Sequence, residues 1–239
     1  MNGETKTLLA IDTATSGCSV CVWRANQGEG QVLAQESLAM ARGQAQELMV
    51  MVDRVLVQAG VEPADLSAVA VTRGPGAFTG LRIALATAKG FALAVGVPCV
   101  GVTTLEAIAA AVPSEERAGT FVLTCVESKR EDLYVQLFDA DLAPLSEPMA
   151  CNAQALQDLV GTGIGSGAPL VLVGDAAQRA HDMLQSSDAT LSDANPLPNP
   201  AHIARIAAAR LGDNPPMPQP LYLRPPDAKL PKNQGRLRT

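Results

Sequence analysis

The segment with the clearest chemical potential is rich in glycine and reads Arg73-Gly74-Pro75-Gly76-Ala77-Phe78-Thr79-Gly80-Leu81-Arg82. It follows a predicted buried strand at 68–72 and opens a predicted helix at 79–95. Glycine permits close backbone approach, and the free N–H groups at the start of a helix can bind an anion. The spacing is GxGxxxG rather than GxGxxG, and the lysine of a Walker A loop is missing. The segment is therefore interpreted either as an anion-binding loop or as a tight structural turn. The candidate residues of an anion site are Gly74, Gly76, Thr79 and Gly80.

Asp12 is a second candidate, because it ends the first predicted strand at 7–12 and precedes a run of hydroxyl side chains. A carboxylate and hydroxyls on a hairpin could hold a metal–phosphate group. The residues of this candidate site are Asp12, Thr13 and Thr15. The alternative is an Asx-type turn, which has the same composition.

The residue types that metal and nucleophilic chemistry require are scarce in this chain. Its two histidines, His181 and His202, stand apart on predicted helices and form no HxxxH or HExxH motif. The GxSxG motif of a serine nucleophile is also missing. Cys18 and Cys21 form a CxxC on a predicted strand, where residues three apart face opposite sides and do not converge on a metal. We predict no catalytic residue, no metal site and no cofactor in this chain.

The predicted elements occur in the same order twice. The first half contains strands at 7–12, 18–24 and 31–38, a helix at 45–60, a strand at 68–72 and a helix at 79–95. Strands at 120–127, 133–139 and about 145–149 open the second half, before another helix, strand and helix. This duplication predicts an α/β, actin-like fold of two ribonuclease-H-like lobes, with mixed sheets flanked by helices, as in actin, sugar kinases and Hsp70. The predicted domains are an N-terminal lobe at 1–103, a C-terminal lobe at 104–220 and a basic, proline-containing tail at 221–239.

The first two helices, at about 43–60 and 79–95, are apolar on more than one face. Five consecutive apolar residues run from Leu48 to Val52, and the second helix has almost no polar face. Helices that are apolar all round are either deeply buried or meet a partner. We favour a partner surface, with burial inside the same lobe as the alternative. The predicted interface residues are Leu48, Met49, Met51, Val52, Val55, Arg82, Leu85, Ala88 and Lys89.

The chain has 239 residues and a formal net charge of −6, which is unevenly distributed. Residues 224–239 carry a charge of +4, so residues 1–223 carry −10. An acidic body does not attract nucleic acid by itself, whereas the basic tail could contact a phosphate backbone or an acidic partner. No apolar run reaches the ~18–20 residues that span a bilayer, and the polar start shows no signal peptide. We therefore expect a cytoplasmic protein without a membrane partner.

Four segments together resemble the bacterial TsaB (YeaZ-like) family. They are Leu9–Thr15 with Cys18–Val20, Arg73–Ile83, Gly101–Leu105 and Pro220–Arg224. The resemblance implies an actin-like fold with a degenerate nucleotide site and a role as the non-catalytic scaffold or activating partner of TsaD. TsaD transfers threonylcarbamoyl to N6 of the adenosine next to the tRNA anticodon, and the ATPase TsaE completes the assembly. ATP and metal are then expected on the partner subunits.

The resemblance also implies where this chain meets its partners. In the family the first two helices pack against their counterparts in TsaD, or in a second TsaB copy when the protein is alone. Contact with tRNA is expected indirectly or through the basic tail. Two departures from the family, Gln44 in place of histidine and Ala77 in place of serine, further weaken a metal or nucleotide role. The alternatives left open are a small actin-like kinase or ATPase that uses Asp12 and the Gly74–Gly80 loop, and a metallopeptidase-like protein.

Overall fold

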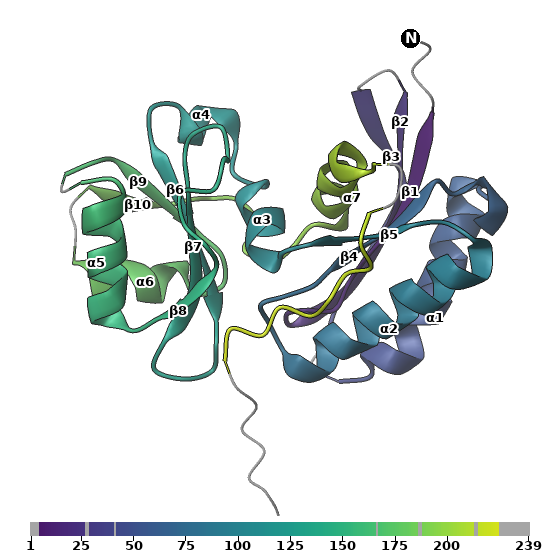
Figure 1. Ribbon diagram of the computed structural model, residues 1–239, viewed down its shortest axis with the longest axis horizontal. Coiled ribbons are helices and arrows are strands. Elements are labelled where there is room, and N and C mark those ends of the chain that lie inside the picture. The colour runs from purple at the N-terminus through teal and green to yellow at the C-terminus, as the bar shows by residue number, and fades with distance from the viewer. Residues whose placement is uncertain are drawn as a thin grey trace, which may run out of the picture.

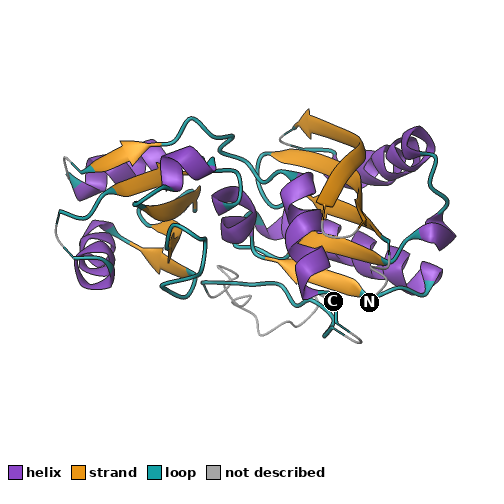
Figure 2. Ribbon diagram, turned by 90° about the horizontal axis from the view of Figure 1, so that it is seen from above, coloured by secondary structure: helices purple, strands orange, loops and turns teal. Residues whose placement is uncertain are grey.

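Two five-stranded mixed sheets, each flanked by helices, form two lobes that lie side by side in Figures 1 and 2. The computed structural model describes residues 5–26, 29–40, 42–165, 167–185, 188–212 and 215–224. The strands of the first sheet are β1 (Lys6–Asp12), β2 (Gly17–Asn26), β3 (Glu29–Ala39), β4 (Ala68–Thr72) and β5 (Cys99–Val102). Those of the second sheet are β6 (Phe121–Glu127), β7 (Leu133–Phe138), β8 (Met149–Cys151), β9 (Leu170–Val173) and β10 (Ala189–Leu191). The predicted α/β class is confirmed.

The two sheets share one topology. The strand orders are β3-β2-β1-β4-β5 and β10-β9-β6-β7-β8. Read from its other edge, the second order is β8-β7-β6-β9-β10, so its strands correspond one by one to those of the first sheet. In each sheet the first three strands form an antiparallel meander, and the two later strands add in parallel beside the first. This duplicated order confirms the predicted pair of ribonuclease-H-like lobes. The structure adds the short strand β10, which the sequence pattern does not predict, and places β8 at 149–151 rather than about 145–149.

Local sequence explains where several helices begin and end. The helices are α1 (Gln44–Ala59), α2 (Phe78–Val95), α3 (Thr104–Ala109), α4 (Ser114–Arg117), α5 (Ala153–Gly163), α6 (Ala177–Leu184) and α7 (Pro200–Arg210), with a 3-10 turn at Pro63–Asp65. Gly60 ends α1 in the left-handed conformation, and Thr103 and Glu106 form a capping box at the start of α3. Asn199 caps α7, whose first residue is a proline.

Helices α1 and α2 cover one face of the first sheet. Six of the predicted interface residues lie in this core, at most 4% exposed: Leu48, Met51, Val52, Val55, Leu85 and Ala88. They pack in one cluster with strand residues such as Leu9, Val20 and Val71. The prediction that these six contact a partner is wrong, and the alternative of burial within the lobe is correct for them. The physical reason is that the sheet presents a wide apolar face, which takes the inner side of both helices.

Helix α2 is the one helix among the described residues whose length and composition would also suit a membrane span. Its inner side packs in the first lobe through Ala84, Ala88 and Ala92. Its place on the first sheet therefore accounts for the apolar character of this inner side, whereas Leu93 on the opposite side is exposed.

Helix α7 covers the other face of the first sheet, although it follows the second lobe in the chain (Figure 1). Its residues Ile203, Ala204 and Ala207 pack with Leu8 and Ala10 of β1. The predicted C-terminal lobe at 104–220 is therefore wrong for this helix. The physical reason is that a strand buried on both sides needs cover on both faces, and α1 and α2 cover only one.

The second sheet also lies between helices. Helices α5 and α6 pack on one face, in a cluster that includes Leu156, Ala180 and Leu172. On the other face, α3 contributes Leu105 and Ile108 to a cluster with strand residues of β6, β7 and β9. Helix α3 also contacts α7, so these two helices join the lobes at the side opposite the described end of the chain.

Candidate functional site

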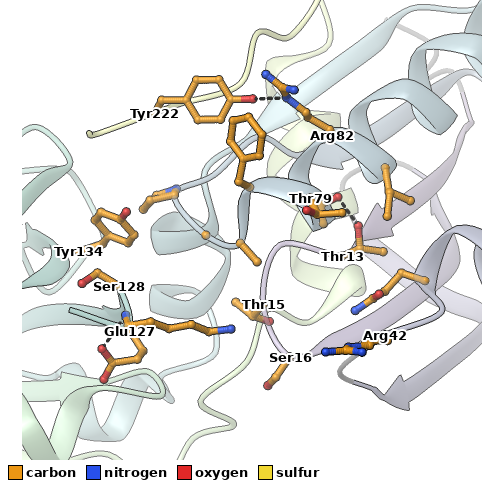
Figure 3. Close-up of a pocket in the computed structure, with 18 of the residues that line it drawn as sticks. Thr13, Thr15, Ser16, Arg42, Thr79, Arg82, Glu127, Ser128, Tyr134 and Tyr222 are labelled. Carbon is orange, nitrogen blue, oxygen red and sulfur yellow. Dashed lines mark hydrogen bonds between the residues drawn. The ribbon is translucent and has the colours of Figure 1, made fainter. Parts of the chain in front are cut away.

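A cleft of about 1220 Å³ lies between the two lobes (Figure 3). The first lobe lines it with the β1–β2 turn, the residues before α1 and the start of α2. The second lobe contributes the turn after β6 and Tyr134 of β7, and residues 221–224 complete the wall. The cleft brings together five residues of the predicted loop site, namely Thr13, Thr15, Gly76, Thr79 and Gly80. Asp12 and Gly74, also predicted for that site, do not line it.

Asp12 is enclosed within the first lobe, where it is only 2% exposed. Its Oδ1 accepts hydrogen bonds from the hydroxyl of Thr72 and from the backbone N–H of Ala14, at 3.0 Å. Burial raises the pKa of this carboxyl to about 6, although the two hydrogen bonds act in the opposite direction. The bond to the N–H two residues on is that of an Asx-type turn, so the geometry favours this interpretation over a metal–phosphate ligand.

The glycines of the loop are needed because two backbone segments touch there. A Cβ at Gly76 would lie 2.2 Å from the carbonyl oxygen of Ala14, and one at Gly80 would lie 1.9 Å from that of Thr13. The hydroxyl of Thr13 donates to the carbonyl of Gly80 at 2.6 Å, and the N–H of Ala77 donates to that of Ala14 at 2.7 Å. The loop therefore packs against the β1–β2 turn, which corresponds to the structural-turn interpretation rather than to an open phosphate cradle.

Residues 215–224, which we call the strap, run along the first lobe and reach the cleft. The N–H of Leu221 donates to the carbonyl of Arg73 at 2.6 Å, and Gly74 has a φ of +107° beside the carbonyl of Leu221. Arg224 then forms an ion pair with Asp132 of the second lobe. The strap therefore contacts both lobes. Within the predicted tail at 221–239, residues 225–239 lie outside the described residues.

An aromatic pair stands at the point where the strap meets α2. The rings of Phe78 and Tyr222 are 5.3 Å apart, and the hydroxyl of Tyr222 accepts a hydrogen bond from Arg82 Nε at 3.0 Å (Figure 3). The guanidinium of Arg82 also lies 3.8 Å from the centre of the Phe78 ring. The sequence pattern predicts a partner interface for Arg82 and does not single out either aromatic residue. The available signal was their rarity, because only 3% of the chain is aromatic.

Basic side chains predominate around the cleft. Its charged lining residues are Arg42, Arg82, Lys129, Arg130 and Arg224, with Glu127 as the one carboxylate among the described lining residues. Glu127 is itself paired with Arg179 at 2.7 Å. The cleft is therefore a positive region of a chain whose net charge is −6.

Within the described ranges, no group of three or more histidine, cysteine or acidic side chains could hold a metal ion. Cys18 packs with α1 and α2, whereas Cys21 packs with α7, which confirms that the two thiols face opposite sides of the sheet. Burial raises the pKa of Cys18 to about 11 and that of Cys21 to about 12. These thiols are therefore inert core residues.

The sides of α1 and α2 that face away from the sheet carry exposed apolar and small residues. We call this surface the α1/α2 outer face and define it by its exposed apolar and small residues, Met49, Val50, Val57, Ala86, Gly90, Leu93 and Ala94. Leu93 is 80% exposed, and a Cβ at Gly90 would meet nothing within 4 Å. Of the predicted interface residues, Met49 lies on this face, Lys89 is half-buried, and Arg82 lines the cleft.

The duplicated sheets, the interlobe cleft and the closed glycine loop define a two-lobed protein of the actin-like class. Comparison with known proteins narrows this class. The family model of TsaD, tRNA N6-adenosine threonylcarbamoyltransferase, matches residues 32–182. The tRNA threonylcarbamoyladenosine biosynthesis protein TsaB of Escherichia coli is 37% identical over 134 residues, which are 56% of this chain and 55% of that protein. The alignment thus spans about half the length of this curated relative.

Two further proteins are similar over nearly the whole chain. An uncharacterized protein of Mycobacterium tuberculosis is 32% identical over 226 residues, or 95% of each chain. The crystal structure of YeaZ from Pseudomonas aeruginosa is 26% identical and superimposes with a TM-score of 0.74, covering 91% of this chain and all of that one. The chain belongs to the TsaB (YeaZ-like) family.

Proposed function

We propose that this chain is the non-catalytic scaffold subunit of a tRNA threonylcarbamoyladenosine complex. It pairs with a TsaD-type catalytic subunit, which transfers threonylcarbamoyl to N6 of the adenosine next to the tRNA anticodon, and a TsaE-type ATPase completes the assembly. ATP and metal bind to those partners, and the complex is cytoplasmic. Beside the family membership, the single observation that carries the proposal is the α1/α2 outer face.

The outer face has the properties of a helix-packing surface. Gly90 lies inside a helix, where glycine costs about 1 kcal/mol relative to alanine, yet no neighbour among the described residues requires its small size. With Ala86 and Ala94 it lets another helix approach closely, and Met49 and Leu93 supply apolar contact. An exposed surface of this kind is typical of a docking site rather than of a free helix.

A TsaD-type subunit is the occupant that the comparisons favour. The TsaD family model matches residues 32–182, a range that contains both α1 and α2. We therefore expect equivalent helices in a TsaD-type chain, and two such helix pairs can meet around a pseudo-twofold axis. The same geometry permits a homodimer when the chain is alone.

The two enzyme alternatives have less support. A kinase or ATPase needs a carboxylate facing the nucleotide and an open phosphate loop, but Asp12 is buried and Gly76 and Gly80 pack against backbone. A metallopeptidase needs a cluster of ligands, and the described residues contain none. Submicromolar ATP binding with turnover by the purified chain, measured by calorimetry, would favour the kinase alternative instead.

The proposal is tested by co-elution with the TsaD-type subunit. Leu93→Glu places a charge in the α1/α2 outer face, where the side chain is too exposed to affect folding. We expect at least ~10-fold weaker association, equivalent to about 1.4 kcal/mol. Leu191→Glu, at an exposed apolar position on β10 of the second lobe, is the matched control and should associate normally.

Unchanged co-elution of folded Leu93→Glu would show that this face is not the interface. Reconstitution of the modification provides the second readout. Activity should require the chain, return with wild type or Leu191→Glu, and stay low with Leu93→Glu. Full activity in the absence of the chain would contradict the scaffold role itself.

A further inference from the structure

The interlobe cleft gathers three aromatic side chains in a chain that has few of them. Three of its lining residues, Phe78, Tyr134 and Tyr222, are aromatic, and the whole sequence has one tryptophan, two tyrosines and four phenylalanines. Phe78 and Tyr222 are 46% and 42% exposed, although the Arg82 guanidinium lies over the Phe78 ring. Exposed aromatic rings lose favourable burial, and here the fold holds two of them together at the cleft rather than in its core.

Basic groups surround these rings from both lobes. Arg42 precedes α1, Lys129 follows β6, and Arg82 and Arg224 lie near the Phe78–Tyr222 pair. They come from four separate segments of the chain, and Figure 3 shows Arg42 and Arg82 apart from each other at the cleft. This distribution suits several singly charged phosphates along a chain better than one multiply charged group.

The local geometry also disfavours a magnesium nucleotide. Asp12 is turned into the lobe by its bonds to Thr72 and Ala14, so it does not line the cleft as a metal ligand. Carbonyl oxygens of Thr13 and Ala14 occupy the space beside Gly80 and Gly76, where a phosphate cradle would need free backbone. At about 1220 Å³, the cleft is also larger than the ~300–1000 Å³ of common small-molecule pockets.

We propose that the interlobe cleft binds single-stranded RNA, with bases against the exposed part of the Phe78–Tyr222 pair and phosphodiesters near Arg42 and Lys129. Aromatic stacking platforms combined with a basic groove are the common means of binding single strands. Within the proposed function, on which this choice of RNA rests, the ligand is an unpaired segment of the tRNA that the complex modifies. The overall charge of −6 then does not prevent RNA contact, because the cleft is locally positive.

The test uses the full-length chain alone and a fluorescein-labelled oligoadenylate, followed by fluorescence anisotropy at several salt concentrations. Arg42→Gln and Lys129→Asn each remove one exposed cation, and asparagine tolerates the positive φ of 61° at position 129. Each variant should bind more weakly and lower the slope of log affinity against log salt by about 0.7. Arg205→Gln changes an exposed residue of α7 that does not line the cleft, so it is the control and should leave the slope unchanged.

Phe78→Ala tests the aromatic contribution separately from the charge contribution. Removal of one stacking platform should weaken binding roughly 5- to 150-fold while the salt slope stays as in wild type. Thermal unfolding of each variant separates a loss of binding from a loss of fold.

Three outcomes would overturn the proposal. The first is no RNA binding by the wild-type chain. The second is binding that weakens with Lys229→Gln and Lys232→Gln in the tail but not with the cleft variants. The third is full displacement of RNA by stoichiometric ATP. The cleft variants leave the α1/α2 outer face intact, so they should still co-elute with a TsaD-type subunit. Failure of RNA binding with normal co-elution would therefore reject this inference alone.

Discussion

Replacement of Asp12 by asparagine should change how the stability of the protein depends on pH. The direction of this change identifies whether the buried carboxyl is protonated. Burial raises the pKa of Asp12 from 3.8 to about 6 in the folded chain. Between these two values the folded state holds a proton that the unfolded state releases. Asp12 therefore contributes its full stability below pH 3.8, and this contribution is lost as the pH rises through 6.

The magnitude follows from the size of the shift. The pKa rises from 3.8 to about 6, and each pKa unit is worth about 1.36 kcal/mol. The unfolding free energy should therefore be about 3 kcal/mol lower at pH 7 than below pH 3.8. Of this, about 2 kcal/mol falls within the range from pH 4 to pH 7. Asparagine has no charge to desolvate, and its amide oxygen can accept the bonds from Thr72 and Ala14. Any penalty for its buried N–H groups is the same at every pH.

The assay is urea unfolding of wild type and Asp12→Asn at a series of pH values. The difference in unfolding free energy should move by about 2 kcal/mol in favour of asparagine from pH 4 to pH 7. Thr72→Val removes a hydrogen bond that lowers the pKa of Asp12, so it should extend the pH-dependent range upward. A difference that does not vary with pH, or that favours wild type as the pH rises, would refute the reasoning and indicate an Asp12 that is ionised and solvated or paired with a cation.

Two further predictions concern packing and the strap. Gly80→Ala should lose about 3 kcal/mol or more, because its Cβ would meet a backbone carbonyl, whereas Gly90→Ala in the same helix should gain about 1 kcal/mol. Similar effects of the two changes in urea unfolding would contradict the assigned environments. Arg224→Ala should lose about 1–2 kcal/mol by leaving the carboxylate of Asp132 without its cation, and the losses should be less than additive with Asp132→Asn in a double-mutant cycle. Strictly additive losses would mean that the ion pair does not couple the strap to the second lobe.

The order of the elements could be predicted because each carries a local signal. Short apolar runs marked the buried strands, and glycine, capping boxes and Asn-Pro marked helix ends such as those at Gly60, Thr103 and Asn199. Repetition of the same order twice then restricted the topology to two lobes of one kind. The pattern places β8 too early and does not predict β10, because strands of three residues carry too little periodicity.

The outward face of α1 and α2 could not be separated from the inward face by pattern. Both sides of these helices carry apolar residues, so the sequence identifies the helices but not the side that the sheet covers. Leu48 and Val52 proved to be core residues, while Val57 and Leu93 are exposed. The position of the first sheet decides which side of each helix is buried. This position depends on pairing between strands that are distant in the sequence.

The sequence by itself determined the class of fold, the family resemblance, the opposite orientation of Cys18 and Cys21, and the importance of the glycine loop. These features depend on local spacing, which a single chain displays directly. Only the tertiary structure decided what the glycines are for, since Gly80 meets Thr13 across 67 residues. It also decided that α7 covers the first sheet and that the strap completes a basic, aromatic cleft. Each of these arises from contacts between segments distant in sequence, and such contacts are formed by packing rather than by local propensity.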